Sequence, residues 1–362
     1  MVRRSGIVNR FFLSIGFAFL LVITGSSQSP DDITFTLTTK NGRKMFRMGE
    51  AIPVEFHFRS RSENTYELHE SSPRERVYYV SPTRLLAEPE DDAVDPLGDY
   101  VYQFQGTVSG PPPQVWMLGP QDVVNEHYVN EWLTFKNPGH YRIVAETSSV
   151  TFAGQRLQFE APRNAIPLRS NFIEIDIVAA ENGWAESQLQ LTIDALENAH
   201  PFPRSVRSQP LESGQFPVVL EASKVLKFLG TPGAARALVR FLDLRNAGEI
   251  SSGLWSSPHR QEVLAAMEAQ LNEPDFAVDV FWLDRVIWLA AGNAIGPRIP
   301  GDPRNPDPQY LTRLSEARTD PKARYISELS AALPHKRGRA RDAAVATLAE
   351  FAETDRRRSQ AK

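Results

Sequence analysis

The chain has 362 residues, of which 41% are apolar, and a formal net charge of −4. A single hydrophobic core rarely extends over a chain of this length, so the length predicts two domains. The small net charge argues against a general nucleic-acid-binding protein. The sequence contains no cysteine, which excludes disulfides, thiolate chemistry and a lipid attached through cysteine.

The first 27 residues have the composition of a signal peptide. Positive charge comes from Arg3, Arg4 and Arg10. A mainly apolar run from Phe11 to Ile23 follows, shorter than the roughly 20 residues that span a bilayer, and small residues come next. We therefore predict cleavage near Ser27 and export to the periplasm or the extracellular space. The alternative is an uncleaved segment that anchors the protein in a membrane through residues 11–24.

Residues 31–180 show the alternation of apolar and polar residues that is typical of half-buried β-strands. The clearest segments are Ile33–Leu37, Val54–Phe58 and Phe172–Ile177. In such a segment one face packs on a core and the other meets water. Turn residues such as Asn41-Gly42 separate the segments and indicate about seven to nine short strands. This pattern predicts an antiparallel β-sandwich.

The segment Asn137–Ile143 resembles the tyrosine corner of immunoglobulin-like (Ig-like) domains. In those domains a turn leads to a tyrosine whose hydroxyl bonds back to nearby backbone, and the residue two positions later points into the core. The resemblance implies that Gly139 lies in the turn, Tyr141 is the corner tyrosine and Ile143 takes the inward position. Trp132, shortly before the corner, is expected to anchor the core.

The spacing of apolar residues changes to every third or fourth position after Gly183, which indicates helices over residues 181–355. Helix starts are marked where a capping residue precedes a proline, at Thr231-Pro232 and Ser257-Pro258. The segment Phe276–Ala291, which contains Trp282 and Trp288, is apolar on most sides. Such a helix is expected inside a stack of helices.

The helix-start signals recur at intervals of roughly 40–47 residues, a spacing similar to that of HEAT-type repeats. A single helix pair cannot bury its apolar stripe alone, so pairs stack into an array. We therefore predict HEAT-like helical repeats over 181–355, with a Pro/Gly-rich inserted loop at 292–308 and a basic tail at 356–362. An unrelated helical bundle is the alternative.

An Ig-like sandwich over 31–180 followed by HEAT-like repeats resembles uncharacterised exported bacterial proteins that combine these two parts. The segment Phe46–Val54 is also similar to the first long strand of Ig-like modules in exported bacterial proteins. The resemblance covers most of the chain and implies no particular activity.

Motifs of catalysis and cofactor binding are missing from the sequence. It contains no Gly-x-Ser-x-Gly, His-Glu-x-x-His, Walker loop or dinucleotide fingerprint, and we predict no catalytic, cofactor or metal residues. A ligand set assembled from distant histidines stays open. The acidic stretch Glu88–Asp99 lacks the spacing of a calcium loop and is interpreted as solvated. The basic groups Lys336–Arg341 and Arg356–Arg358 are interpreted as exposed charge.

The function expected from this reasoning is non-enzymatic binding or scaffolding in the cell envelope. Loops on a rigid sandwich and the groove of a helical array are typical binding surfaces, so the expected partner is a protein or peptide and not a nucleic acid. Contact with a membrane is expected only if the N-terminal segment stays uncleaved. The alternatives are a protease inhibitor or hydrolase that uses the Ig-like domain, and a purely structural protein.

Overall fold

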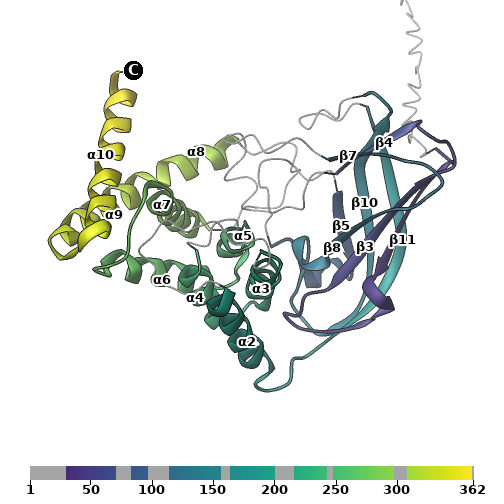
Figure 1. The fold of residues 1–362 in the computed structure, drawn as a ribbon, viewed down its shortest axis with the longest axis horizontal. Helices are drawn as coiled ribbons and strands as arrows, with labels where there is room; N and C mark the ends of the chain where they lie inside the picture. Colours follow the sequence, from purple (N-terminus) through teal and green to yellow (C-terminus); the bar gives the residue numbers. More distant parts are fainter. Residues whose placement is uncertain are drawn as a thin grey trace, which may run out of the picture.

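The computed structural model describes residues 30–70, 83–96, 114–155, 164–199, 216–242, 248–296 and 308–360. A β-rich part over residues 33–178 precedes a helical part that starts at Trp184 (Figure 1), so the expected order of strands and then helices is confirmed. The proposed signal peptide and membrane anchor lie outside the described residues. Among the helices that the structure describes, none combines the length and the apolar character needed to cross a membrane.

In its described residues, the β-rich part contains three sheets. The first, which is antiparallel, has the order β1 (Ile33–Thr39), β3 (Pro53–Ser60), β8 (Val123–Tyr128). The second has the order β2 (Met45–Arg47), β11 (Ala165–Val178), β10 (Gly139–Phe152), β4 (Tyr66–Glu70), β7 (Gln114–Met117), with β5 (Thr83–Glu88) paired to β10. The third pairs β6 (Ala93–Val94) with β9 (Thr134–Phe135).

The alternation in the sequence decides which side chains of these strands are buried. In β3, Val54, Phe56 and Phe58 are buried, and the residues between them are more exposed. Phe58 stacks on Phe35 of β1 with ring centroids 4.5 Å apart. The inward residues of the two larger sheets join in one apolar cluster, which is the core of the β-rich part.

The prediction of an Ig-like sandwich is wrong. The second sheet is mixed, because β2 pairs parallel to β11, and β10 and β11 are 14-residue strands instead of short ones. β10 also pairs with β5 and then β4 along its length. Alternation places a residue on one face of a strand, but it carries no information on which strand lies next to which.

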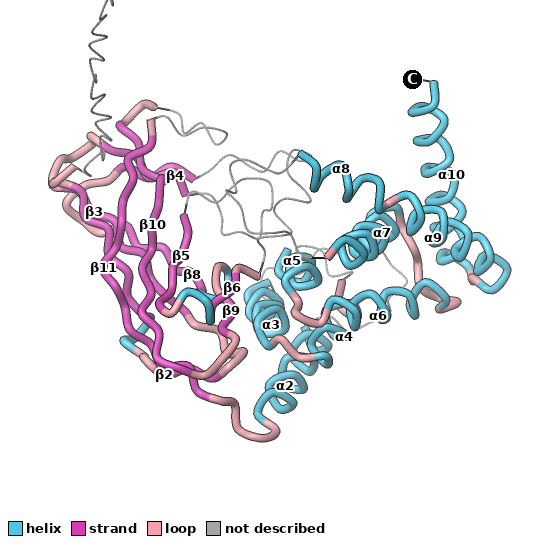
Figure 2. Tube along the Cα trace, turned by 180° about the vertical axis from the view of Figure 1, so that it is seen from behind, coloured by secondary structure: helices cyan, strands magenta, loops and turns pink. Residues whose placement is uncertain are grey.

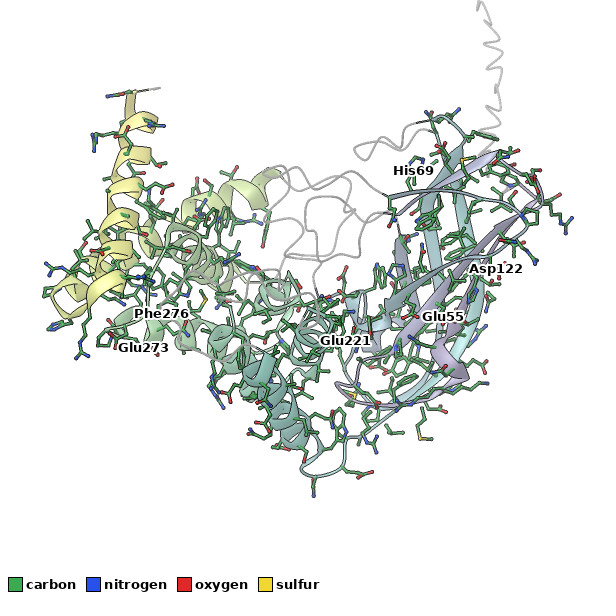
Figure 3. All side chains as sticks on the ribbon, in the orientation of Figure 1. Glu55, His69, Asp122, Glu221, Glu273 and Phe276 are labelled. Atoms are coloured by element: carbon green, nitrogen blue, oxygen red, sulfur yellow. The ribbon has the colours of Figure 1, made fainter. Side chains whose placement is uncertain are left out.

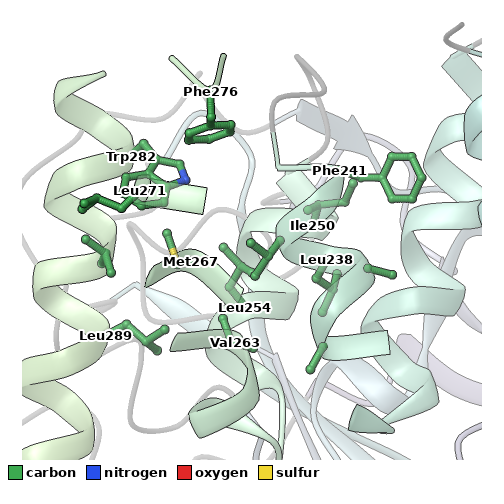
Figure 4. Close-up of a cluster of buried hydrophobic side chains, with 14 of the residues drawn as sticks. Leu238, Phe241, Ile250, Leu254, Val263, Met267, Leu271, Phe276, Trp282 and Leu289 are labelled. Carbon is green, nitrogen blue, oxygen red and sulfur yellow. The ribbon is translucent and has the colours of Figure 1, made fainter. Parts of the chain in front are cut away.

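The helical part contains α2 (Trp184–Ala199), α3 (Phe216–Leu229), α4 (Pro232–Arg240), α5 (Gly248–Ser256), α6 (Arg260–Asn272), α7 (Val280–Ile295), α8 (Pro308–Ala317), α9 (Thr319–Ala332) and α10 (Gly338–Gln360). Its apolar core gathers side chains from most of these helices (Figure 4). Met267 of α6 and Leu283 of α7 are fully buried there. In Figure 2 the helices nearest to the strands are α3 and α5, and α10 lies at the opposite end.

The prediction of HEAT-like repeats is also wrong, because the described helices form no clear repeats. Their lengths range from 9 residues in α4 and α5 to 23 in α10. Packing does not follow successive pairs either, since α3 contacts α2, α4 and α5, and α7 contacts α6, α8, α9 and α10. Capping residues mark where a helix begins, but they do not determine which helices pack together.

The two predicted helix starts behave differently. Thr231 caps α4, where its Oγ1 accepts a hydrogen bond from the Ala234 amide at 3.2 Å and Pro232 is the first helical residue. Ser257 and Pro258 precede α6, which begins only at Arg260, and the Ser257 hydroxyl accepts from the His259 amide instead. A hydroxyl therefore accepts a backbone amide at both sites, but only Thr231 caps a helix, because α6 has no side-chain cap.

Tyr141 makes the backbone contact that the tyrosine-corner resemblance implied. It lies near the start of β10, which begins at Gly139, and its hydroxyl donates to the Asn137 carbonyl at 2.8 Å. Burial raises the pKa of this hydroxyl. Ile143 is fully buried two positions later. This local motif therefore occurs in a sheet whose strand order is not that of an Ig domain.

Replacing Tyr141 with phenylalanine is expected to lower the free energy of unfolding by about 1 kcal/mol, because the Asn137 carbonyl loses its donor. The ring, 4.5 Å from that of Phe135, keeps its packing in this variant. Urea denaturation of both proteins measures the difference. An unchanged midpoint would show that the hydrogen bond contributes nothing to the corner.

Candidate functional site

The β-rich and helical parts meet where α3 packs on strand β8, a contact that we call the junction. The Tyr128 hydroxyl of β8 donates to Glu221 of α3 at 3.0 Å, and its ring lies 5.8 Å from that of Phe228. The Lys224 ammonium lies 4.6 Å from the centre of the same Tyr128 ring. Figure 3 shows Glu221 at this boundary.

A buried lysine joins three elements at the junction. The Lys227 Nζ of α3 is 2.6 Å from Glu131, in the 3₁₀ turn Val129–Glu131 after β8, and 2.9 Å from Glu249 of α5. The three side chains are at most 2% exposed. Burial alone would lower the pKa of Lys227, but the two carboxylates outweigh it and raise the pKa above its usual range. The ammonium is therefore charged and shared between the β-rich part and α5.

The turn before β3 fits closely against the end of α3. Gly49 has φ +80°, and a Cβ at this position would lie 2.8 Å from the carbonyl oxygen of Leu229. A side chain there is excluded both by the backbone conformation and by the contact. The junction thus extends from β8 to the turn that contains Gly49.

His127 is buried directly beside the junction. Its ring centroid lies 4.5 Å from that of Phe56 and 5.5 Å from that of Trp132. Burial lowers the pKa of His127 to about 4, and the charge of Lys224 acts in the same direction. The imidazole is therefore neutral at pH 7.

The second notable feature is an apolar strand at the end of the larger sheet. Val115, Trp116 and Met117 of β7 are 49%, 40% and 43% exposed. Within the described residues β7 has a strand on one side only, namely β4. Exposed large apolar side chains that gather at one place are typical of interaction surfaces.

No strand of the described residues pairs with the outer backbone edge of β7. The amide of Leu118, directly after β7, donates to the Tyr66 carbonyl of β4 at 2.9 Å. Backbone groups alternate in direction along an antiparallel strand. The N–H and C=O groups of Trp116 therefore also point towards β4. The N–H and C=O groups of Val115 and Met117 therefore point away from β4. We call these groups and the three apolar side chains the β7 edge.

The residues singled out in the sequence lie in the two cores and do not come together in one site. Trp132 is buried in the β-rich core and donates from its indole to the Thr83 carbonyl at 3.0 Å. Trp282 is buried in the helical core beside Phe276. Trp288 is partly buried between α7 and α8, with the Arg318 guanidinium 3.6 Å from its ring.

The interpretation of Lys336 as exposed charge is wrong. Lys336 is buried, and its ammonium donates to the carbonyls of Glu273 and Phe276 at 2.7 and 3.0 Å; both residues are labelled in Figure 3. Burial lowers its pKa. The hydrogen bonds of Lys336 therefore stabilise the segment between α6 and α7. In contrast, Arg337, Arg339 and Arg341 are exposed.

Metal-binding clusters of histidine and acidic residues are not found in the part of the chain that the structure describes. Within the acidic stretch, Glu88 binds Arg142 at 2.7 Å, and Asp92 accepts from the Asn137 side chain at 2.8 Å. These acids form part of the protein's own contacts.

The sequence analysis missed both the junction and the β7 edge. Lys227 and Glu131 are 96 positions apart, so no local motif connects them. The β7 edge had a weak signal: Val115, Trp116 and Met117 form an uncharged apolar run. No protein-family model matches the chain, and no similar curated protein is found.

Proposed function

We propose that this protein is a non-enzymatic binding or scaffolding protein of the cell envelope, and that the β7 edge binds an extended segment of a protein or peptide. The signal-peptide composition of residues 1–27 supports the location. The observation that carries the binding function is the exposed, uncharged strand β7, whose outer backbone edge pairs with no strand among the described residues.

Strand addition is the recognition mode that fits this edge. A sheet edge presents a row of unused N–H and C=O groups, which natural proteins usually protect with charges, proline or a bulge. The segment Gln114–Met117 contains neither charged residues nor proline. A ligand in extended conformation pairs with such an edge through its main chain, and its alternate side chains give specificity.

The side chains of β7 define what the ligand carries. Val115 and Met117 lie on one face of the strand and Trp116 on the other, because successive side chains alternate. A ligand strand with apolar residues at alternate positions therefore places them all on one face of the sheet, beside Val115 and Met117 or beside Trp116.

A peptide-selection experiment tests this proposal. Phage-displayed random ten-residue peptides, selected against the purified protein, are expected to converge on segments with alternating apolar residues. The substitution Val115→Pro removes an outward N–H without removing a bond to β4, so we expect at least tenfold weaker binding of the selected peptides. Methyl NMR reports the contact directly, because Met117 is one of five methionines and its signal is expected to shift.

Two further variants make this test specific. Val115→Thr keeps the backbone donor and is expected to bind much better than Val115→Pro. Phe281→Ser changes a 74% exposed aromatic residue on α7 and is expected to leave binding unchanged. If no peptide is enriched, or if Val115→Pro binds as tightly as the unmodified protein, the β7 edge is not the binding site.

A further inference from the structure

Three side chains form one row across the larger sheet, and their exposure rises towards its β7 end. Val150 of β10 lies opposite Leu68 of β4, and Leu68 lies opposite Trp116 of β7. Val150 and Leu68 are fully buried in the core of the β-rich part, whereas Trp116 is 40% exposed. We call the sheet face that bears this row the inner face. Trp116 therefore continues a core row at a position where no described strand follows β7.

A second row on the inner face reaches the same end of the sheet. Phe152 of β10 lies opposite Tyr66 of β4, with the two ring centroids 5.4 Å apart. Leu118, directly after β7, donates its amide to the Tyr66 carbonyl. Tyr66 and Leu118 are buried, and Phe152 is largely exposed. The apolar surface around Trp116 therefore continues into buried side chains of the core.

The opposite face of the sheet, which we call the outer face, has polar neighbours beside β7. Val115 lies opposite His69 of β4, and Met117 lies opposite Glu67. His69, labelled in Figure 3, has its Nε2 2.8 Å from the Thr151 hydroxyl. The Glu67 carboxylate accepts a hydrogen bond from a backbone amide at 3.1 Å. The apolar surface that Val115 and Met117 form is therefore bordered by polar side chains on β4.

We propose that the segment bound at the β7 edge places its large apolar side chains on the inner face, over Trp116, and its polar side chains on the outer face. This inference rests on the proposed function, because it concerns a ligand of the same edge. Alternation alone leaves the face open, since a slip of one residue moves every ligand side chain to the other face. On the inner face the ligand extends the core and removes the Trp116 indole from water.

Backbone geometry favours the same face. A ligand forms its hydrogen-bonded pairs with Val115 and Met117, whose N–H and C=O groups point away from β4. Antiparallel pairing is the slightly more stable direction, and in it the ligand residue opposite Trp116 belongs to a pair without hydrogen bonds. The Cα atoms of such a pair lie about 4.5 Å apart, compared with about 5.5 Å in a hydrogen-bonded pair. The closest side-chain contact at the edge is therefore made with an indole, which offers a large apolar surface.

A peptide that can use either face tests this inference. The probe is a dye-labelled eight-residue peptide in which valine and threonine alternate, and fluorescence anisotropy measures its affinity for the full chain. Trp116→Thr removes the inner-face indole but keeps a residue that suits a strand. We expect this variant to bind the probe about tenfold more weakly. The matched control is the double variant Val115→Thr, Met117→Thr on the outer face, which is expected to bind within about threefold of the unmodified protein.

Cross-linking identifies the face in the unmodified protein, so its result does not depend on the folding of a variant. A photoreactive leucine analogue replaces one central valine of the probe, or one central threonine in a second probe. Mass spectrometry of the digested adducts locates the attached residue. We expect the valine position to cross-link to Trp116 and the threonine position to cross-link to Val115 or Met117.

The outcomes separate this inference from the proposed function. If the double variant loses affinity and Trp116→Thr does not, or if the valine position cross-links to Val115 or Met117, this inference is overturned while the β7 edge remains the binding site. If Val115→Pro loses the probe but neither set of threonine variants does, main-chain bonds alone hold the ligand and this inference is again overturned. If the unmodified protein binds neither this probe nor any selected peptide, the proposed function and this inference fail together.

Discussion

Replacement of Lys227 with methionine is expected to lower the free energy of unfolding by about 3–5 kcal/mol, the usual cost of removing one partner of a buried ion pair. Methionine fills a similar volume but leaves the carboxylates of Glu131 and Glu249 buried without the ammonium at 2.6 and 2.9 Å. Two like charges then remain in a site of low dielectric constant. The loss is expected to weaken the attachment of the β-rich part to α3 and α5 together.

Urea denaturation measures this loss, and two comparisons interpret it. Lys322→Met removes one partner of the more exposed pair with Asp355 and is expected to cost less than about 1 kcal/mol. In the triple variant Lys227→Met, Glu131→Leu, Glu249→Leu the buried charges are gone, and most of the lost stability is expected to return. If Lys227→Met costs no more than Lys322→Met, the buried cluster does not hold the junction.

The sequence identified the class of each half because periodicity is a local property. Val54, Phe56 and Phe58 alternate with polar residues and form β3, and the apolar segment around Trp282 forms the buried helix α7. Local signals also located the Thr231 cap and the Tyr141 corner. Each of these depends on residues within a few positions of one another, which a single sequence displays directly.

The arrangement of the elements was not accessible in the same way. The parallel pairing of β2 with β11 places Phe46 beside Ile177. No turn residue or residue spacing in the sequence indicates this pairing. The two helices that caps marked begin at the predicted proline or two residues after it, and the helix expected from Phe276 begins at Val280. How the helices pack depends instead on side-chain shape across the core. The familiar combination of Ig-like and HEAT-like folds was inferred from local signals that many folds share.

The candidate site was even less predictable, because its residues have no chemical signature in sequence. Lys227, Glu131 and Glu249 are common charged residues, and only their burial together makes them notable. The β7 edge differs from a core strand only in what covers it, since Val115, Trp116 and Met117 would suit an interior equally well. Position in the sheet, which is a property of the whole fold, turns this apolar run into a candidate binding surface.

Acidification is expected to lower the free energy of unfolding by about 3 kcal/mol through His127 alone. The folded-state pKa of about 4 lies below the value of 6.5 for an unperturbed histidine, and each unit of difference corresponds to about 1.4 kcal/mol. Since the folded pKa is lowered, the unfolded chain binds the proton first. The contribution is fully present above pH 6.5 and is lost as the pH falls towards 4.

Carboxylates titrate in the lower part of this range, so the variant His127→Gln is needed to isolate the effect. Urea denaturation at pH 8, 6.5, 5 and 4 gives the difference in stability between the two proteins at each pH. We expect this difference to be constant above pH 6.5 and then to move in favour of His127→Gln by about 3 kcal/mol at pH 4, because glutamine binds no proton. A difference that stays constant with pH would mean that the folded protein accommodates a charged His127. In that case water or a nearby group must stabilise the imidazolium, and the aromatic surroundings formed by Phe56 and Trp132 would not be the dominant influence on its protonation.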